Sequence, residues 1–228
     1  MIAACSYPTY DPTDLASASN ASMNLRVVTD VYEPGSVFKT FVSAAAIEHK
    51  GLTPNTTFDV PAEVLVGSDI VRDVDKRGAA MTMSLREILR RSSNTGMVLV
   101  GEKLGADAFS EYVIDGFQSG KSTGIDFLGE SLGIIKKRSE YDGASLGSMS
   151  FGQSLAVEPV QMVRAMSAIA NKGSYDDPAF PQDPCGRGGR LDRRRAPRPL
   201  RRDGRQRRRH DADRCGRGHG HGRPDAWL

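Results

Sequence analysis

The sequence predicts an α+β fold in which helices predominate and strands are few and short. Apolar residues recur with the spacing of one helix face from Ser36 to Lys50 and again from Pro159 to Ile169. Between these segments nothing indicates the alternation of strands and helices that builds a parallel sheet. The chain also contains no internal repeat, so a single helix-rich unit is expected.

The first elements follow from local signals. The short apolar segment Ile2–Ser6 predicts a strand, and two prolines place the residues after it in a loop. The helix from Ser36 is expected to end at Gly51, because glycine is typical of a helix C-terminus. Ser36 then falls at or next to the N-cap of that helix.

Later helices carry clear start and stop signals. Ser84 and Glu87 have the spacing of a capping box, which predicts that a helix starts at Ser84. Another helix is expected from about Thr95 to Gly105, and a further one over about Asp107–Phe117. Pro159 is a favoured first helical residue and predicts the start of the last helix.

Charge divides the chain into two parts at Tyr175. Residues 1–175 hold 16 Lys and Arg against 20 Asp and Glu, whereas residues 176–228 hold 15 Arg against 8 Asp. The second part contains no Lys, Glu, Ile or Val. Such a composition cannot bury enough apolar surface to offset its ordering entropy. We therefore expect residues 1–175 to fold and residues 176–228 to be a disordered tail rich in Arg, Gly, Pro and Asp.

Cysteines and hydropathy add little to this division. Cys5 lies near the start, and Cys185 and Cys215 fall in the expected tail, so no disulfide framework or metal-ligand spacing follows. No window approaches the roughly 18 consecutive apolar residues of a membrane-spanning helix. The chain itself is therefore expected to carry no signal or membrane segment.

Ser36 and Lys39 form the first candidate catalytic pair. A serine hydroxyl is a weak nucleophile at neutral pH and needs a nearby base. Three residues apart on a helix, the two side chains share one face, and a buried lysine loses its proton more easily because burial lowers its pKa. The spacing alone is weak evidence, since ordinary helix-face pairs have it too.

Ser92 and Asn94 form the second candidate pair, in a short loop expected between two helices. The Ser92 hydroxyl is suited to relaying a proton, and the Asn94 amide to holding a peptide carbonyl. Helix-capping residues in a turn have the same spacing, as does Ser22-Met23-Asn24. Each pair gains weight only from the segments around it.

Taken together and in this order, the segments resemble the class B penicillin-binding proteins. Tyr32-Glu33-Pro34-Gly35-Ser36-Val37-Phe38-Lys39 is similar to that family's nucleophile segment, and Arg91-Ser92-Ser93-Asn94-Thr95-Gly96 to its second motif. Other similar segments are Ser6-Tyr7-Pro8-Thr9-Tyr10-Asp11-Pro12, Thr123-Gly124-Ile125-Asp126, Gly129-Glu130, Ser150-Phe151-Gly152-Gln153, Pro159-Val160-Gln161 and Ala170-Asn171. The resemblance covers nearly all of residues 1–175.

The resemblance implies a fold and a chemistry. The fold would be a helix-rich part of the penicillin-binding transpeptidase and serine β-lactamase-like fold, with an incomplete antiparallel sheet. Ser36 would attack the penultimate D-alanine carbonyl of a peptidoglycan stem peptide, with Lys39 as base, Ser92 as proton relay and Asn94 positioning the substrate. β-Lactams would acylate Ser36 as mimics of that donor. No cofactor or metal is implied.

The family pattern also implies a Lys-Thr-Gly or Lys-Ser-Gly triplet on a strand after Gln153, where this sequence has none. Lys121-Ser122-Thr123-Gly124 has one residue too many and precedes that point, so we expect it not to substitute. We therefore expect a transpeptidase domain truncated at both ends and inactive as written. The change of composition near Tyr175 suggests a frameshift in the coding sequence.

The resemblance also implies a location. The parent family is anchored in the cytoplasmic membrane with an extracytoplasmic catalytic domain, and works with membrane-embedded cell-wall synthesis machinery.

Two other functions share the Ser36 and Lys39 pair, namely a β-lactam sensor that is acylated without turnover and a serine β-lactamase. Arginine runs in the tail raise a nucleic-acid-binding arm as a further alternative. Interspersed aspartates weaken it, and no nucleic-acid partner is expected.

Overall fold

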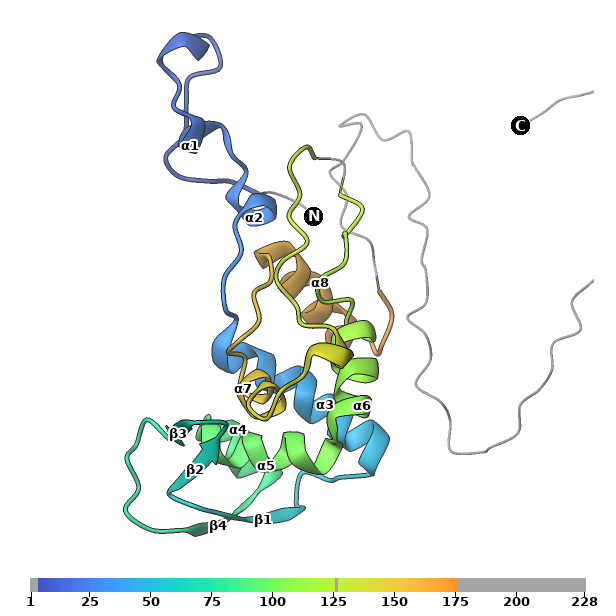
Figure 1. The fold of residues 1–228 in the computed structure, drawn as a ribbon. Helices are drawn as coiled ribbons and strands as arrows, with labels where there is room; N and C mark the ends of the chain where they lie inside the picture. Colours follow the sequence, from blue (N-terminus) through green and yellow to red (C-terminus); the bar gives the residue numbers. More distant parts are fainter. Residues whose placement is uncertain (1–3, 126, 176–228) are drawn as a thin grey trace, which may run out of the picture.

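The computed structural model describes residues 4–125 and 127–175. Its helices gather around α3 (Lys39–Lys50), which contacts α5 (Asn94–Leu104), and α5 in turn packs on α7 (Ser145–Ser150). Helix α8 (Pro159–Ala170) adds Met162 and Ala165 to the same core. Figure 1 shows these helices together, with the four strands below them and an N-terminal extension above.

The N-terminal extension contains short helical turns, η1 (Leu15–Ser17), α1 (Asn20–Met23) and α2 (Arg26–Thr29). Helix α2 packs on α8, where Val28 and Val160 form a second small apolar cluster with Ile125 from a loop. The prediction of a strand over Ile2–Ser6 is wrong for its described part, since residues 4–6 form no strand. No neighbouring strand in the described part of the chain offers these residues a hydrogen-bonding partner.

The predicted helix after Ser36 is confirmed, with a tighter first turn. A 3₁₀ turn, η2 (Gly35–Phe38), leads directly into α3. Helix α3 ends at Lys50 with Gly51 as its C-cap, whose φ of 64° lies in the left-handed region that glycine adopts without strain. Ser36 is thus the second residue of the 3₁₀ turn, and Lys39 is the first residue of the α-helix.

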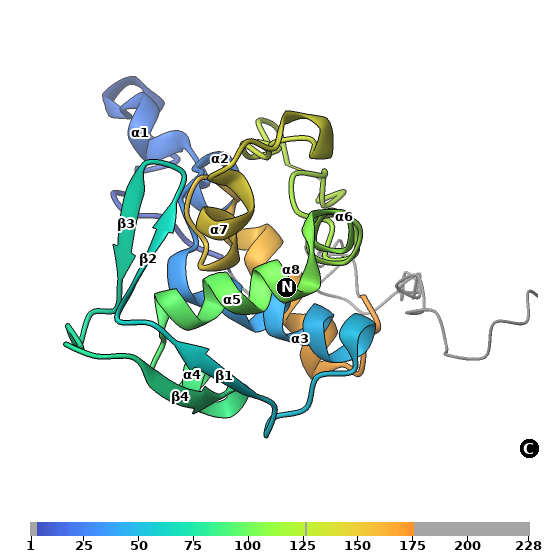
Figure 2. The same ribbon diagram turned by 60° about the horizontal axis from the view of Figure 1, so that its bottom comes forward.

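The strands form two separate antiparallel pairs. β1 (Thr57–Val60) pairs with β4 (Met81–Ser84), with Thr57 opposite Ser84. β2 (Glu63–Val66) and β3 (Asp69–Arg72) form a hairpin. Figure 2 shows this hairpin beside α7 and the β1–β4 pair beside α4 and α5. The expectation of a helix-rich α+β fold with antiparallel strands is confirmed.

The helices after β4 begin where their sequence signals predict. Helix α4 (Leu85–Arg90) has Ser84 as its N-cap, with a complete capping box to Glu87. The helix expected over Asp107–Phe117 is present as a short α6 (Ala106–Ala108) that continues into a π-helical segment, η3 (Phe109–Asp115). A 3₁₀ turn, η4 (Arg138–Glu140), precedes α7. Pro159 is the first residue of α8, as predicted.

Helices α5 and α7 approach each other closely at Gly101. A Cβ atom at this position would lie 1.8 Å from the Ser150 Oγ, so only glycine fits. The Ser150 hydroxyl, directed away from solvent, donates to the carbonyl of Leu146 at 2.6 Å. The close packing of Gly101 against Ser150 places α7, and with it the Phe151-Gly152-Gln153 segment, against the helix that follows the Ser92–Asn94 turn.

Two further observations concern the extent of the fold. Among residues 4–125 and 127–175 no helix is long and apolar enough to cross a membrane. The predicted disordered tail, residues 176–228, lies outside the described residues, as do Cys185 and Cys215. The division at Tyr175 and the frameshift both stay predictions.

Candidate active site

The turn that carries Ser36 is clamped onto the segment after α7. The Gly35 N–H donates to the Gly152 carbonyl at 3.0 Å. Gly152 has a φ of 85°, and a Cβ there would lie 2.0 Å from the Gly35 oxygen, so a side chain would separate the two segments. The Ser154 N–H donates to a Glu33 carboxylate oxygen at 2.9 Å. The Phe-Gly-Gln segment therefore fixes the position of the candidate nucleophile.

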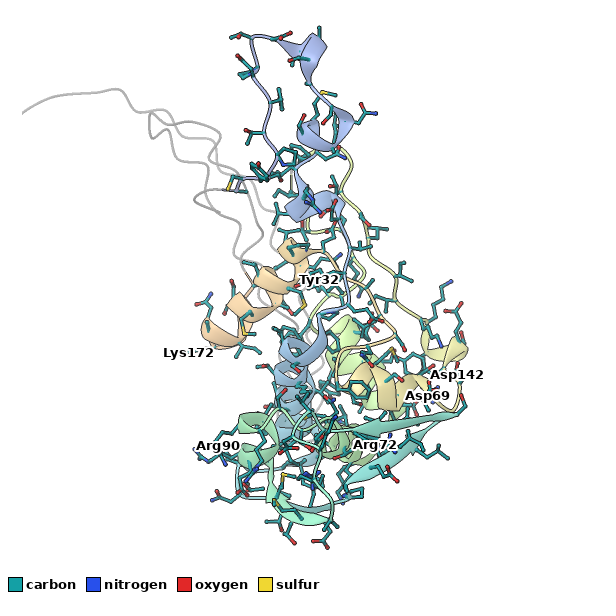
Figure 3. All side chains as sticks on the ribbon, turned by 90° about the vertical axis from the view of Figure 1, so that its left-hand side faces the viewer. Tyr32, Asp69, Arg72, Arg90, Asp142 and Lys172 are labelled. Atoms are coloured by element: carbon teal, nitrogen blue, oxygen red, sulfur yellow. The ribbon has the colours of Figure 1, made fainter. Side chains whose placement is uncertain are left out.

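A backbone bridge extends this clamp. Tyr32 and Val157 exchange N–H to carbonyl hydrogen bonds, both 3.0 Å long. Figure 3 shows Tyr32 on the segment between the N-terminal extension and the helical body, next to the beginning of α8. The start of the Ser36 turn and the start of α8 are thus held side by side.

Lys39 lies at the centre of the candidate site and is 1% exposed. Its ammonium nitrogen, Nζ, donates to the Ser92 carbonyl at 2.6 Å, to the Ser92 Oγ at 3.0 Å and to the Asn94 Oδ1 at 2.7 Å. Burial lowers the pKa of Lys39 from 10.5 to about 8, against the opposing charge of Asp73. A measurable fraction of this amine is therefore neutral near pH 7.5.

Ser92 connects Lys39 to Ser36. The Ser92 Oγ donates to the Ser36 Oγ at 2.8 Å while it accepts from Lys39 Nζ. In the described part of the chain, no hydrogen bond joins Ser36 and Lys39 directly. Ser36 and Lys39 were expected to meet on one helix face. Instead Ser36 lies in the 3₁₀ turn and is exposed, and Ser92 links it to Lys39 through two hydrogen bonds.

The Ser92–Asn94 turn has an unusual backbone. Ser92 has a φ of 53°, a conformation that residues other than glycine adopt rarely and at an energetic cost. Ser93 is the N-cap of α5, and its side chain accepts from the Gly96 N–H. The strained conformation allows both the carbonyl and the hydroxyl of Ser92 to face Lys39 Nζ.

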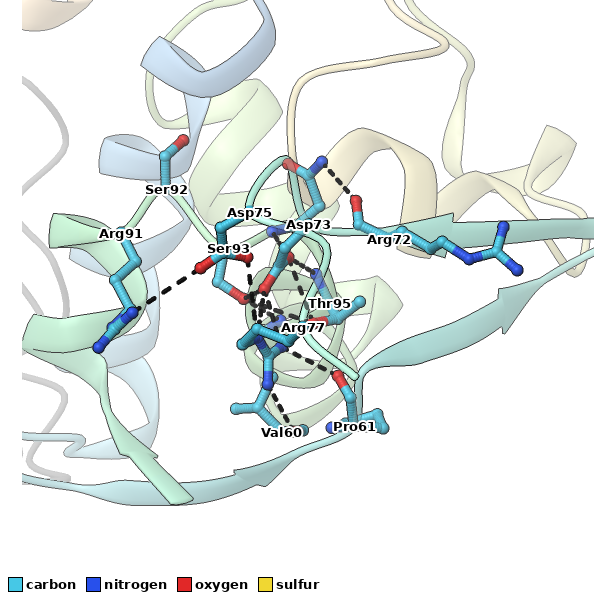
Figure 4. Close-up of polar contacts among 12 residues, drawn as sticks. Val60, Pro61, Arg72, Asp73, Asp75, Arg77, Arg91, Ser92, Ser93 and Thr95 are labelled. Atoms are coloured by element: carbon cyan, nitrogen blue, oxygen red, sulfur yellow. Dashed lines mark hydrogen bonds and ion pairs between the residues drawn. The ribbon is translucent and has the colours of Figure 1, made fainter. Parts of the chain in front are cut away.

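A buried ion pair beneath this turn was not predicted from the sequence. Asp73 follows β3, and its side chain and that of Arg77 are 5% and 8% exposed, with a 2.8 Å contact between them. Figure 4 shows Arg77 reaching the carbonyls of Val60 and Pro61, at 3.2 and 3.0 Å. The sequence signal for this pair was an aspartate and an arginine four residues apart. In a segment of turn-like composition, the same spacing is equally typical of an ion pair exposed to solvent, so it did not indicate burial.

Lys121-Ser122-Thr123-Gly124 does not form a sheet-edge strand. The segment is a loop, and the hydroxyls of Ser122 and Thr123 both donate to the Glu130 carboxylate. Lys121 pairs with Asp115 at 2.8 Å. The Ser122 and Thr123 hydroxyls are thus engaged by Glu130, and Lys121 by Asp115 at the end of η3.

The arrangement has the parts of a proton path. With a protonated lysine the hydrogen bonds run from Lys39 to Ser92 and on to Ser36. With a neutral lysine the same oxygens permit the reverse order, in which Ser36 donates to Ser92 and Ser92 donates to Lys39. Such a chain can remove the hydroxyl proton of Ser36 as its oxygen attacks a carbonyl. Within the described residues, no group of three His, Cys, Asp or Glu side chains could hold a metal ion.

A helix-rich α+β fold with a serine linked to a buried lysine defines a class of serine acyl-transfer domains. Residues 1–200 match the penicillin binding protein transpeptidase domain family. The chain therefore belongs to this family, which confirms the resemblance predicted from the motifs.

Two curated relatives illustrate the similarity. Stage V sporulation protein D of Bacillus subtilis (strain 168) is 34% identical over 176 residues, which are 76% of this chain and 27% of that protein. Peptidoglycan D,D-transpeptidase FtsI of Escherichia coli (strain K12) is 27% identical over 175 residues, 77% of this chain and 29% of that protein. The chain thus spans less than a third of the length of these relatives.

A solved structure of similar fold comes from the same family. Penicillin-binding protein 3 of Mycobacterium tuberculosis, in complex with aztreonam, superposes with a TM-score of 0.70 at 27% identity. The match covers 75% of this chain and 38% of that structure. The two structures therefore share a fold over the matched part.

Proposed function

We propose that this chain is the nucleophile-bearing part of a peptidoglycan D,D-transpeptidase, in which Ser36 forms an acyl-enzyme. The observation that carries this proposal is the hydrogen-bond chain from the buried Lys39 amine through Ser92 to the Ser36 hydroxyl. Family membership supports the substrate class, which is a stem peptide ending in D-alanyl-D-alanine.

In the proposed acylation, the Ser36 oxygen bonds to the carbonyl carbon of the penultimate D-alanine. The bond from that carbon to the last D-alanine breaks. The Ser36 proton passes through Ser92 to neutral Lys39 and is then returned to the leaving amine. Asn94, whose Nδ2 donates to the Arg72 carbonyl and whose Oδ1 contacts Lys39, orients the donor peptide.

In the second step an amine of a neighbouring peptide attacks the ester carbonyl, and Ser36 recovers its proton. A β-lactam enters at the first step because its ring amide takes the place of the scissile peptide bond. Its leaving nitrogen stays tethered to the acyl group, so the acyl-enzyme persists.

We expect both steps to be slow in this chain, because the oxyanion forms in acylation as well as in transfer. The third motif of the family supplies a carboxylate anchor and an oxyanion-hole N–H, and the sequence has no such triplet after Gln153. One oxyanion donor contributes about 10²–10³ in rate. The parent protein would act on the outer side of the cytoplasmic membrane, where its stem-peptide substrate is found.

A fluorescent penicillin tests the proposal. The full chain and its Ser36→Ala variant are incubated with the probe and the bound fluorescence is measured after denaturation. Ser167→Ala is a matched control, because Ser167 lies on α8 and donates only to the carbonyl one turn before it. Stable labelling that is lost in Ser36→Ala alone supports the proposal.

Other outcomes separate the alternatives. A folded chain that takes no label contradicts the proposed function. Label that is bound and then released rapidly indicates a hydrolase of the β-lactamase kind. A stem-peptide donor separates the transpeptidase from a sensor module: the proposed enzyme part releases the last D-alanine from it, whereas a sensor takes stable penicillin label without that release.

A further inference from the structure

We infer that Asp73 is a positioning residue of this site: its carboxylate, paired with Arg77, holds the Ser92–Asn94 turn so that Ser92 and Asn94 face Lys39. The inference rests on the proposed function, because that function gives Ser36, Lys39 and Ser92 their catalytic roles. Its geometric basis is independent of that function, because it concerns the contacts of one buried carboxylate.

The carboxylate of Asp73 receives hydrogen bonds on both oxygens. Oδ1 accepts from the backbone N–H groups of Asn94 and Thr95, at 2.6 and 3.0 Å, and from the Thr95 hydroxyl at 3.3 Å. Oδ2 accepts from the Ser93 hydroxyl at 2.8 Å and from Arg77, at 2.8 and 3.2 Å. Six donors therefore converge on one side chain that is 6% exposed as a residue.

These contacts occur at the first turn of α5, an eleven-residue helix. The free N–H groups and the positive end of a helix favour an anion there. Asp73 comes from the end of β3, so it joins the strand to the residues that surround Lys39. Figure 4 shows the carboxylate between Arg77 and the turn, with Ser92 on the side away from Arg77.

The contacts of Asp73 and Lys39 lie on opposite sides of the same three residues. Asp73 binds Ser93 through its hydroxyl and Asn94 through its N–H, while Lys39 binds the Ser92 carbonyl, the Ser92 hydroxyl and the Asn94 amide oxygen. Ser92 keeps its positive φ between these two sets of bonds. Loss of the Asp73 contacts removes the acceptor of the Asn94 N–H, while the Ser93 side chain keeps its bond from the Gly96 N–H and the Asn94 Nδ2 keeps its bond to the Arg72 carbonyl. The turn is then tied to β3 through the Asn94 side chain but no longer through the Asp73 carboxylate.

The negative charge of Asp73 also influences the pKa of Lys39. Burial would raise the pKa of Asp73, but hydrogen bonds from Thr95, Ser93, Arg77 and Asn94 outweigh it and keep the pKa below its ordinary value. The carboxylate therefore stays charged, and its charge opposes the effect of burial on the pKa of Lys39. Ser92 and Asn94, which also face Lys39, carry no charge.

Asparagine cannot replace this carboxylate. Both oxygens of Asp73 accept from donors, and the NH₂ group of an amide would have to face either Arg77 or the start of α5. Asp73→Asn also leaves Arg77 as a buried unpaired charge, which alone could prevent folding. The informative variant is therefore the double substitution Asp73→Leu with Arg77→Met, which removes both charges together with the acceptors of the Asn94 and Thr95 N–H groups and of the Ser93 hydroxyl.

The test compares full-length chains by their rate of acylation with fluorescent penicillin between pH 5.5 and 9. The double variant is expected to fold and to lose about 100-fold in the plateau rate, since a displacement of about 1 Å at a catalytic group costs about that much. The midpoint of its pH profile is expected to move below that of the parent. Loss of structure alone would reduce the labelled fraction without moving this midpoint.

Val100→Ala is the matched control. It removes two buried methyl groups from a later turn of α5 and is expected to lower stability. It touches neither Asp73 nor Lys39, so its rate and midpoint should equal those of the parent. A folded double variant with the parent's rate and midpoint would overturn the inference.

A second readout does not depend on acylation. The pKa of Lys39 is measured by NMR on isotope-labelled lysine, with the resonance assigned by its absence in Lys39→Arg. A lower pKa in the double variant supports the inference even where the parent takes no penicillin, and in that case the proposed function fails alone. An unchanged pKa overturns the inference whatever the acylation result.

Discussion

The pH dependence of acylation tests whether Lys39 is the base. Its pKa of about 8 means that about a quarter of the chains hold a neutral Lys39 at pH 7.5, whereas a lysine at 10.5 would be neutral in about one chain in a thousand. The shift corresponds to about 3 kcal/mol against the charged form. Burial therefore provides roughly 200-fold more neutral amine at this pH.

The acylation rate should follow the neutral fraction of Lys39. It is expected to rise about tenfold per pH unit up to about pH 7, and to level off above about pH 8. The measurement is the second-order rate of labelling with a fluorescent penicillin from pH 5.5 to 9. Lys39→Met should lose both the fast reaction and its pH dependence. Lys50→Met, at the exposed end of the same helix, should retain both.

Two results would refute this reasoning. A rate that still rises tenfold per unit at pH 9 would mean that the base has an ordinary lysine pKa and is not buried. A midpoint near pH 8 that persists in Lys39→Met would assign the titration to another group.

Further predictions concern groups around the site and in the core. Asn94→Asp places a carboxylate 2.7 Å from the Lys39 amine, and should raise the pKa of Lys39 and move the acylation midpoint to higher pH. Burial raises the pKa of Glu158, which is 0% exposed, from 4.5 to about 7, so stability should fall as pH rises between these values. Glu158→Gln should remove that dependence and stabilise the chain at pH 8 by up to about 3 kcal/mol in urea unfolding. A flat profile in the parent would contradict it. Gly101→Ala should destabilise by about 1–3 kcal/mol because its methyl group meets Ser150, and adding Ser150→Gly should restore part of the loss. No recovery in the double variant would show that the two helices do not approach there.

Local signals in the sequence were enough to predict where most helices begin and end. Ser84 with Glu87, Gly51 and Pro159 each act within one helical turn, so their effect does not depend on the rest of the fold. The four candidate site residues also lie together, as the resemblance to the class B penicillin-binding proteins implied. The spacing within each pair did not specify that the two segments meet. The catalytic roles of the four residues stay predictions.

Features that depend on distant partners were missed or misjudged. Asp73 acts on residues about 20 positions further along the chain, and its burial depends on how β3 meets α5. A strand needs a neighbour, so the apolar character of Ile2–Ser6 was not sufficient to make residues 4–6, its described part, a strand. The π-helical stretch Phe109–Asp115 has an apolar pattern close enough to that of an α-helix that periodicity does not distinguish the two.

Peptide mapping of the penicillin adduct tests the central claim most directly. The full chain is treated with a penicillin, digested, and analysed by mass spectrometry to identify the modified residue. The account predicts one adduct per chain, on the peptide containing Ser36 and at the Ser36 oxygen. An adduct at any other residue, or a folded chain without an adduct, would contradict it.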